Sequence, residues 1–192
     1  MGDNMNFGEL YIILQETKPS DAIIKNEDAI FKLIPELKKC KGFNQNNPWH
    51  PYDVYNHILH VVDNVDNDLT LRLIALFHDI GKPETYTEDE KGIGHFKNHW
   101  LVSQNIFDYY AIKYDIINRK SISLLIKYHD YSLDKLEEIE KYFTNEELIM
   151  LFKIKKADLL AQSSKYHYLL NDIDKKEKEL LKKRGVYSGK RI

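Results

Sequence analysis

The segment Leu69–Phe77, with the sequence LTLRLIALF, most constrains the fold of this chain, because apolar residues occupy almost every side of it. A helix that is apolar nearly all round belongs in a protein interior and must be covered by other elements. We expect this helix to extend over 69–80 and to stop at Gly81 and Pro83. The sequence therefore predicts a buried central helix with several partners around it.

The remaining apolar residues recur mainly at the spacing of amphipathic helices. Short apolar runs such as Leu10–Leu14 have the length of strands, but nothing in the sequence pairs them. Irregular connections are expected at 42–51 and 83–97, where Asn, Pro and Gly are frequent. The sequence predicts an all-α fold, with further helices at 5–17, 20–40, 52–64, 98–114, 119–130, 144–162 and 166–184.

Residues that are typical of helix N-termini support the predicted first residues of three of these helices. Ser20 and Asn98 are suitable N-caps for the helices that follow them. Thr144 is followed three residues later by Glu147, which is the arrangement of a capping box. We therefore expect helices to begin at or next to these residues.

Composition limits the class of protein and its surroundings. Hydrophobic residues make up 43% of the 192 residues, enough for a sizeable core, and a net charge of -2 gives no general attraction to nucleic acid or membranes. Cys40 is the one cysteine, which excludes an intramolecular disulfide and a cysteine-cluster metal site. No apolar run approaches the roughly 20 residues of a membrane span, and residues 1–10 lack the layout of a secretory signal. We expect a cytoplasmic protein without a membrane partner, and make no prediction of its oligomeric state.

Imidazole and carboxylate side chains fall on or beside the apolar faces of four predicted helices. Such groups are costly to bury unless they are paired or bind a cation. A fifth predicted helix begins with His99, and His95 lies in the connection before it. The inward-facing residues are His57, His78, Asp79, His129 and Asp158.

Each of these residues also has a purely structural interpretation. His57 alone would be read as a histidine at the core edge with a backbone partner, and Asp158 as a buried partner for Lys or Arg. Convergence of the whole set favours a metal centre instead. Nitrogen and oxygen donors without thiolate suit Mn, Fe, Zn, Co, Ni or Mg, so we expect one or two divalent ions of this group.

The order of these residues resembles the pattern H…HD…D of the HD superfamily of metal-dependent phosphohydrolases. Residues 76–83, LFHDIGKP, look like the HDIGK signature of that family. The resemblance extends over about 20–165 and is closest to the HD region of bacterial tRNA nucleotidyltransferases, the CCA-adding enzymes. The segments similar to that region are 45–57, 94–99 and 156–162.

The resemblance implies a compact HD-domain helical bundle in three parts. These are N-terminal connector helices packed on the core at 1–41, an HD phosphohydrolase domain at 42–165, and a charged C-terminal helix and tail at 166–192. The sequence shows no nucleotidyltransferase head, so nucleotide addition is not expected. Trp100 stands where family members often have Glu, which weakens any supporting role for that position beside His99.

The resemblance also implies the metal ligands. One divalent ion would be held by His57, His78, Asp79 and Asp158. Six donors exceed what one water-activating ion requires, and this excess suggests a second ion held by His99 and His129, with Asp79 bridging. In the single-ion alternative, His95, His99 and His129 bind the substrate phosphate instead.

The implied activity is hydrolysis of a phosphomonoester or a cyclic phosphodiester. Asp79 and Lys82 are the expected catalytic residues: Asp79 orients water, and Lys82 binds the phosphate and offsets its developing charge. The expected substrate is a small-molecule nucleotide or a nucleic-acid end.

A non-catalytic RNA-binding or nucleotide-sensing module that retains the HD fold is the alternative. RNA binding would need a basic surface, for which Lys38, Lys39, Lys41 and 175–184 are candidates. The lysines of 175–184 are interleaved with acidic residues, which is typical of a solvated helix face. Measured phosphate release would separate an enzyme from both alternatives.

Overall fold

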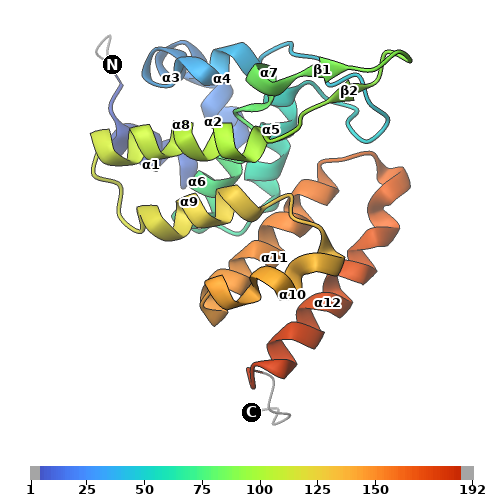
Figure 1. Ribbon diagram of the computed structural model, residues 1–192. Coiled ribbons are helices and arrows are strands. Elements are labelled where there is room, and N and C mark those ends of the chain that lie inside the picture. Colours follow the sequence, from blue (N-terminus) through green and yellow to red (C-terminus); the bar gives the residue numbers. More distant parts are fainter. Residues whose placement is uncertain (1–4, 187–192) are drawn as a thin grey trace.

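The structure is a computed structural model that describes residues 5–186, and it is almost entirely helical (Figure 1). The last part of the predicted tail, 187–192, lies outside the described residues. A two-stranded hairpin is formed by β1 (Thr87–Glu88) and β2 (Gly94–His95). The helices are α1 (Phe7–Leu14), α2 (Pro19–Lys25), α3 (Glu27–Leu33), α4 (Pro35–Cys40), α5 (Val54–Asn64), α6 (Leu69–Phe77), α7 (Lys82–Thr85), α8 (His99–Lys113), α9 (Arg119–Tyr128), α10 (Leu136–Ile139), α11 (Asn145–Leu160) and α12 (Leu170–Lys183). Short 3-10 turns are at Leu133–Lys135, Glu140–Tyr142 and Ser164–Leu169.

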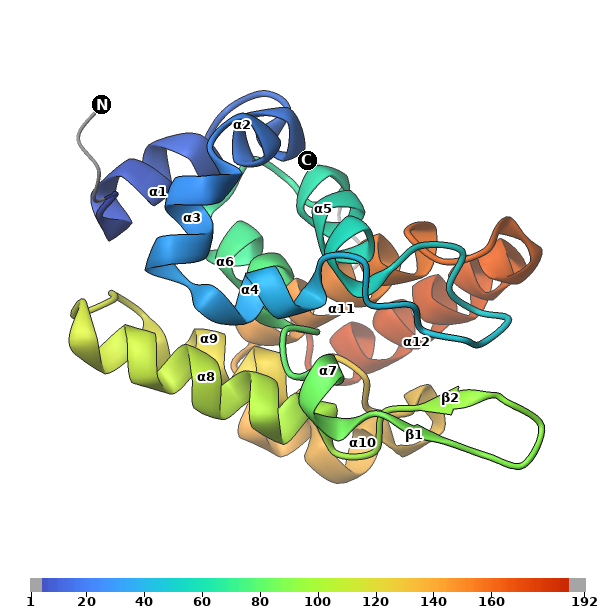
Figure 2. The ribbon, with the colours of Figure 1, turned by 90° about the horizontal axis from the view of Figure 1, so that it is seen from above.

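Helix α6 is the central element, as its composition predicted. It contacts α1, α5, α8, α9 and α11, and Figure 2 shows it in the middle of these helices. Every residue from Leu71 to Phe77 is buried, including Arg72. The Arg72 guanidinium donates to the carbonyl oxygens of Leu14 and Glu16, where α1 ends. These hydrogen bonds compensate the burial of a charge and fasten α1 to the central helix.

The prediction of a single helix at 20–40 is wrong, because this region forms three short helices, α2, α3 and α4. Pro35 restricts Ile34 to an extended backbone, with φ -131° and ψ 81°, and so separates α3 from α4. Ser20 is not an N-cap: it lies in the first turn of α2, and its amide and hydroxyl donate to the Asp63 carboxylate on α5. Side-chain hydrogen bonding to another helix thus replaced the expected local cap.

The connection expected at 83–97 contains helix α7 and the hairpin, which the sequence did not predict. Each strand has two residues, Thr87 pairing with His95 and Glu88 with Gly94, too few for a visible alternation of apolar residues. Gly94 is required by close packing, because a Cβ there would lie 2.2 Å from the Gln45 carbonyl oxygen. The Gly94 amide donates to the Asn46 carbonyl at 2.8 Å, which holds the hairpin beside the loop before α5.

The expected helix starts had mixed outcomes. The Thr144 and Glu147 capping box is present at the start of α11, with hydrogen bonds in both directions. Asn98 precedes α8 but adopts a left-handed backbone with φ 66°, and its side chain makes no capping hydrogen bond. Its role is therefore to turn the chain into α8, which aims the first residue of that helix into the protein.

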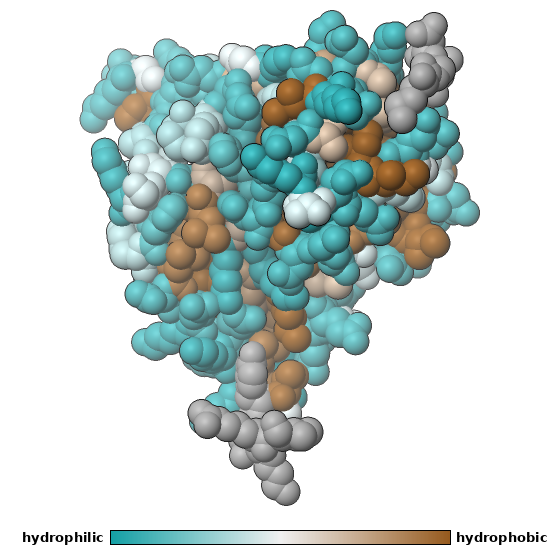
Figure 3. Space-filling view, turned by 180° about the vertical axis from the view of Figure 1, so that it is seen from behind, coloured by the Kyte–Doolittle hydropathy of each residue, from teal (hydrophilic) through white to brown (hydrophobic). Residues whose placement is uncertain are grey.

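Helix α12 packs against α11, and two of its lysines form ion pairs with the segment that contains α10. Lys176 lies 2.8 Å from Glu137, and Lys183 lies 2.7 Å from Glu140. The face in Figure 3 is mostly hydrophilic, with separate apolar patches. Among the described residues, no helix has the length and apolar character needed to cross a bilayer.

Candidate metal centre

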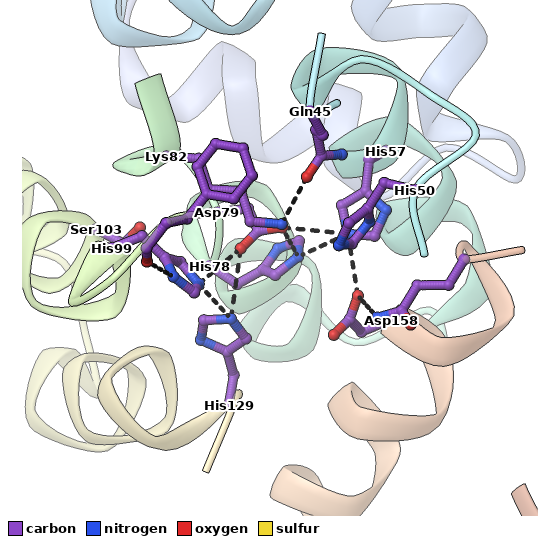
Figure 4. A network of polar contacts seen from close by, with 12 residues as sticks. Gln45, His50, His57, His78, Asp79, Lys82, His99, Ser103, His129 and Asp158 are labelled. Atoms are coloured by element: carbon purple, nitrogen blue, oxygen red, sulfur yellow. Dashed lines mark hydrogen bonds and ion pairs between the residues drawn. The ribbon is translucent and has the colours of Figure 1, made fainter. Parts of the chain in front are cut away.

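Four buried histidines converge on one buried aspartate in the interior of the bundle (Figure 4). His57 lies in α5, and His78 and Asp79 directly follow α6. His99 is the first residue of α8, and His129 caps the C-terminus of α9. Because three of these histidines sit at helix ends, their rings are placed by backbone geometry that the neighbouring helices hold rigid.

Asp79 lies between two pairs of imidazoles. Its Oδ2 atom is 3.2 Å from His57 Nε2 and 3.3 Å from His78 Nε2. Its Oδ1 atom is 3.1 Å from His99 Nε2 and 3.5 Å from His129 Nε2. Two groups of three donors result, each with its atoms within 4.8 Å of one another, and Asp79 belongs to both.

The hydrogen bonds of the histidine rings define which nitrogen is free to bind a cation. Nδ1 of each ring at the helix ends lies 2.7–2.8 Å from the carbonyl oxygen three residues earlier, and the residues are His78, His99 and His129. A carbonyl only accepts, so this network assigns the proton to Nδ1 and leaves a lone pair on Nε2 of the neutral ring. Backbone carbonyls orient metal-binding histidines in the same way.

This donor set fits a divalent cation. With Nδ1 protonated, the Nε2 atoms of His99 and His129 and the Oδ1 atom of Asp79 are all acceptors, and they would repel one another without positive charge between them. The ring nitrogens of His99 and His129 lie 3.4 Å apart. Ligands about 2.0–2.2 Å from one ion, at right or tetrahedral angles, are separated by about 2.8–3.6 Å. The spacing of the donors therefore matches that around a metal ion.

Asp158 extends the cluster from α11. Its Oδ1 atom lies 3.0 Å from His57 Nε2, although Asp158 is outside both close groups of donors. The Gln162 side-chain amide donates to the same oxygen at 3.3 Å. The Asp158 side chain is 16% exposed, so it faces the opening of the site rather than the core.

Burial and the neighbouring groups shift the pKa values of several residues in the cluster. Burial opposes ionisation of Asp79, but its electrostatic interactions with His78 and Lys82 hold its pKa well below the usual range. Burial opposes charge on His57 as well, yet hydrogen bonds to Asp158 and Asp79 raise its pKa. Burial lowers the pKa of His129, which favours its neutral form. Asp79 is thus an anion facing a neutral His129.

Lys82 is buried at the edge of the cluster. Its Nζ atom lies 2.6 Å from Asp79 Oδ2 and donates to Gln45 Oε1 at 2.9 Å. It also lies over the Phe96 ring, 5.3 Å from the ring centroid. Lys82 is therefore fixed between the aspartate and the loop before α5.

Gln45 and His50 are part of the site, although the sequence did not identify them. Gln45 is fully buried, and the His50 ring meets the His57 ring edge to face at 4.9 Å. Burial lowers the pKa of His50 to about 2, so this ring is neutral. Both lie in an irregular loop where no periodicity marks an inward position, and the similarity of segment 45–57 was the one available signal.

A pocket of about 560 Å³ opens from Asp79 to the surface. Its walls come from the loop before α5, the hairpin and the C-terminal end of α11. His95 lines the pocket but does not join the cluster: its side chain is 55% exposed and 3.2 Å from Asp89 on the hairpin. The residues that line it include Trp49, Lys82, His95, Lys97, Asp158 and Gln162.

Comparison with known proteins agrees with this arrangement. The family model described as the HD domain matches residues 49–177. The Multifunctional CCA protein of Cupriavidus necator is 36% identical over 78 residues, covering 38% of this chain and 19% of the relative. The A-adding tRNA nucleotidyltransferase of Deinococcus radiodurans is 30% identical over 99 residues, covering 47% and 23%. The Multifunctional CCA protein of Dechloromonas aromatica is 25% identical over 165 residues, covering 82% and 38%.

The chain thus spans between about a fifth and two fifths of the length of these curated relatives. The similarity to the HD region of CCA-adding enzymes, expected from the sequence, is confirmed. With an HD-domain match over most of its length and an all-α bundle enclosing paired histidines and aspartates, the chain belongs to the HD domain family.

Proposed function

We propose that this protein is a metal-dependent phosphohydrolase that cleaves a phosphomonoester or a cyclic phosphodiester of a nucleotide or a nucleic-acid end. The observation that carries the proposal is the position of Asp79, which lies between two imidazole pairs and beside Lys82 at the base of an open pocket. Carboxylate, imidazole and ammonium groups together can bind a divalent ion and an anionic ester in one place.

The proposed ligands form two sets that share one carboxylate. The inner set is His57, His78, Asp79 and Asp158, and the outer set is Asp79, His99 and His129. Divalent ions bound there supply charge that acidifies water and polarises a phosphoryl oxygen. Asp79 remains ionised and accepts a hydrogen bond from the attacking water, while the Lys82 ammonium donates to the phosphoryl group.

The single-ion alternative assigns His95, His99 and His129 to direct binding of the phosphate. An anion needs hydrogen-bond donors, so the Nε2 atoms of His99 and His129 would both have to carry protons. Burial lowers the pKa of His129 and opposes that protonation. The acceptor character of His129 therefore supports a cation at the outer set, with His95 and Lys97 left to meet the substrate nearer the surface.

A nucleotide or a nucleic-acid end is proposed as substrate because the named relatives are CCA proteins and a tRNA nucleotidyltransferase. The non-catalytic RNA-binding alternative finds less support, since several of its candidate lysines are ion-paired with neighbouring acids. Lys39 pairs with Glu84, and Lys41 pairs with Glu27.

The test is metal analysis of the purified protein, followed by assays of the chelated and the metal-reconstituted forms. The panel contains nucleoside monophosphates, cyclic nucleotides and oligoribonucleotides with a terminal phosphate, each with Mn, Fe, Co, Ni, Zn and Mg. Release of phosphate, or opening of the cyclic ester, by the reconstituted form alone is expected. Failure of every metal form to hydrolyse any member of the panel would overturn the proposal.

A further inference from the structure

An exposed tryptophan forms part of the wall of the same pocket. Trp49 lines the cavity together with Asp79 and Lys82, yet it remains 40% exposed. Its indole stacks on the Tyr166 ring, with centroids 3.6 Å apart and an interplanar angle of 21°. An indole held parallel to a second ring, with much of its surface still in solvent, offers a flat apolar platform.

The backbone around Trp49 makes this platform rigid. The Ser163 amide, just after α11, donates to the Trp49 carbonyl at 2.8 Å. The Asn47 side-chain oxygen accepts from the Trp49 amide at 3.1 Å. Trp49 is therefore fastened on both sides and loses little freedom when a ligand binds, which favours affinity.

The pocket has two chemically different regions. Lys82, Lys97 and His95 provide positive or hydrogen-bonding groups in the region of Asp79 and the hairpin. Trp49 and Pro48, from the loop before α5, add an apolar and aromatic wall. A volume of about 560 Å³ lies within the roughly 300–1,000 Å³ of small-molecule sites, so one ligand can reach both regions.

We propose that Trp49 is the platform on which the base of a nucleotide stacks while its phosphate lies at Asp79 and Lys82. This inference rests on the proposed phosphohydrolase function and adds the group that selects nucleotides over other phosphoesters. Stacking tolerates any base, because every base presents a π-face. The site therefore selects for a nucleobase without selecting one particular base.

Binding is tested through the fluorescence of Trp49. The chain has two tryptophans, so Trp100→Phe leaves Trp49 as the single reporter. Nucleoside monophosphates and ribose 5-phosphate are titrated into the chelated and the metal-loaded forms of this variant. Saturable quenching by the nucleotides, without quenching by ribose 5-phosphate, is expected. If none of four nucleoside monophosphates quenches, and an oligoribonucleotide also fails to quench, the platform is rejected.

Substitution separates a stacking role from a structural one. Trp49→Ala is expected to weaken nucleoside monophosphate binding by about tenfold to one hundredfold, the usual effect of removing one stacked base contact, and to leave ribose 5-phosphate unaffected. Trp49→Tyr keeps an aromatic face and is expected to retain most of the affinity. The matched control is Tyr52→Ala. Tyr52 is an exposed aromatic residue of the same loop, but its ring packs at a tilt against His60 and does not line the pocket.

Two outcomes distinguish failure of the platform from failure of the proposed function. If Trp49→Ala lowers kcat/KM equally for a nucleotide and for ribose 5-phosphate, hydrolysis stands and the platform is overturned. If nucleotides quench Trp49 but no ester is cleaved, the platform stands and the proposed activity fails. A Trp49→Ala effect on an oligoribonucleotide alone assigns the stacked base to an RNA end, and an effect on mononucleotides assigns it to a free nucleotide.

Discussion

Lys82 Nζ lies 2.6 Å from Asp79 Oδ2, the same carboxylate oxygen that faces His57 and His78. The ammonium thus lies where it partly neutralises a carboxylate that is proposed to bind a metal. A metal ion near Oδ2 would be repelled by the Lys82 ammonium, because both positive charges compete for the same carboxylate oxygen. Lys82 is therefore expected to affect metal affinity and phosphate binding in opposite directions.

Lys82→Met should bind Mn²⁺ more tightly, by about tenfold, while losing about one hundredfold in hydrolysis, because the competing cation and the phosphate ligand disappear together. Calorimetric titration with Mn²⁺ and kcat/KM for a nucleotide ester measure the two effects. Lys97→Met is the control: it lines the pocket but is exposed, and should change Mn²⁺ affinity less than twofold. Weaker Mn²⁺ binding by Lys82→Met would show that Lys82 does not compete with the metal for Asp79 Oδ2.

Asp79→Asn should abolish both metal binding and hydrolysis while the fold is retained. Asp79 is the residue common to both groups of donors, and the amide preserves its size while removing its charge. Metal content by elemental analysis, activity, and helicity by circular dichroism measure the three properties. Wild-type activity in a metal-free Asp79→Asn protein would show that the site is wrongly assigned.

Helical elements of the site could be predicted because their signals are local. The apolar sequence of α6 predicts its burial, and this places His78 and Asp79 inside the protein. His129 and Asp158 follow from their spacing to apolar residues on α9 and α11. The hairpin and Gln45 could not be predicted, since two-residue strands and an irregular loop have no periodicity. Their positions depend on contacts between segments about 40 residues apart.

Gly81 shows a second limit of sequence reasoning. The sequence predicts that the buried helix stops at Gly81, but the backbone angles of Gly81, with φ -83° and ψ -6°, are available to any residue. The reason is packing: a Cβ at this position would lie 2.6 Å from the Ser103 amide and 2.7 Å from the His99 carbonyl. The glycine thus permits close approach of α8, a tertiary contact that no local pattern reveals.

Gly81→Ala should therefore destabilise the protein by about 1–3 kcal/mol and weaken metal binding, because α8 must move and carry His99 with it. Thermal unfolding and metal titration measure the two effects. Gly42→Ala provides the contrast: Gly42 has φ 74° and nothing within 4 Å of an added Cβ, so only backbone strain is expected. If both variants bind metal equally well, the contact with α8 does not position His99.

Lys155 on α11 should stabilise the segment that carries His129. Its Nζ atom donates to the carbonyl oxygens of His129 and Tyr131, at 2.8 and 2.5 Å. Lys155→Met leaves both carbonyl oxygens without this donor. We expect the free energy of unfolding, measured by chemical denaturation, to fall by about 1–3 kcal/mol. Lys153, on the same helix as Lys155, forms an exposed ion pair with Asp66 from the connection between α5 and α6, and Lys153→Met should cost less than about 1 kcal/mol of stability. Equal losses in the two variants would argue against a special role for Lys155.

Metal stoichiometry decides between the one-ion and two-ion arrangements. Asp79 offers Oδ2 to His57 and His78, and Oδ1 to His99 and His129, so each oxygen can serve a separate ion. Two ions roughly 3.5–4 Å apart can stabilise the attacking and the leaving oxygens together.

His129→Ala removes a ligand of the outer set and leaves every ligand of the inner set in place. Elemental analysis should therefore give two ions per chain in the wild type and one in His129→Ala. A value near one in both proteins would eliminate the second ion and assign His99 and His129 to the phosphate, with a higher KM in His129→Ala as the accompanying sign.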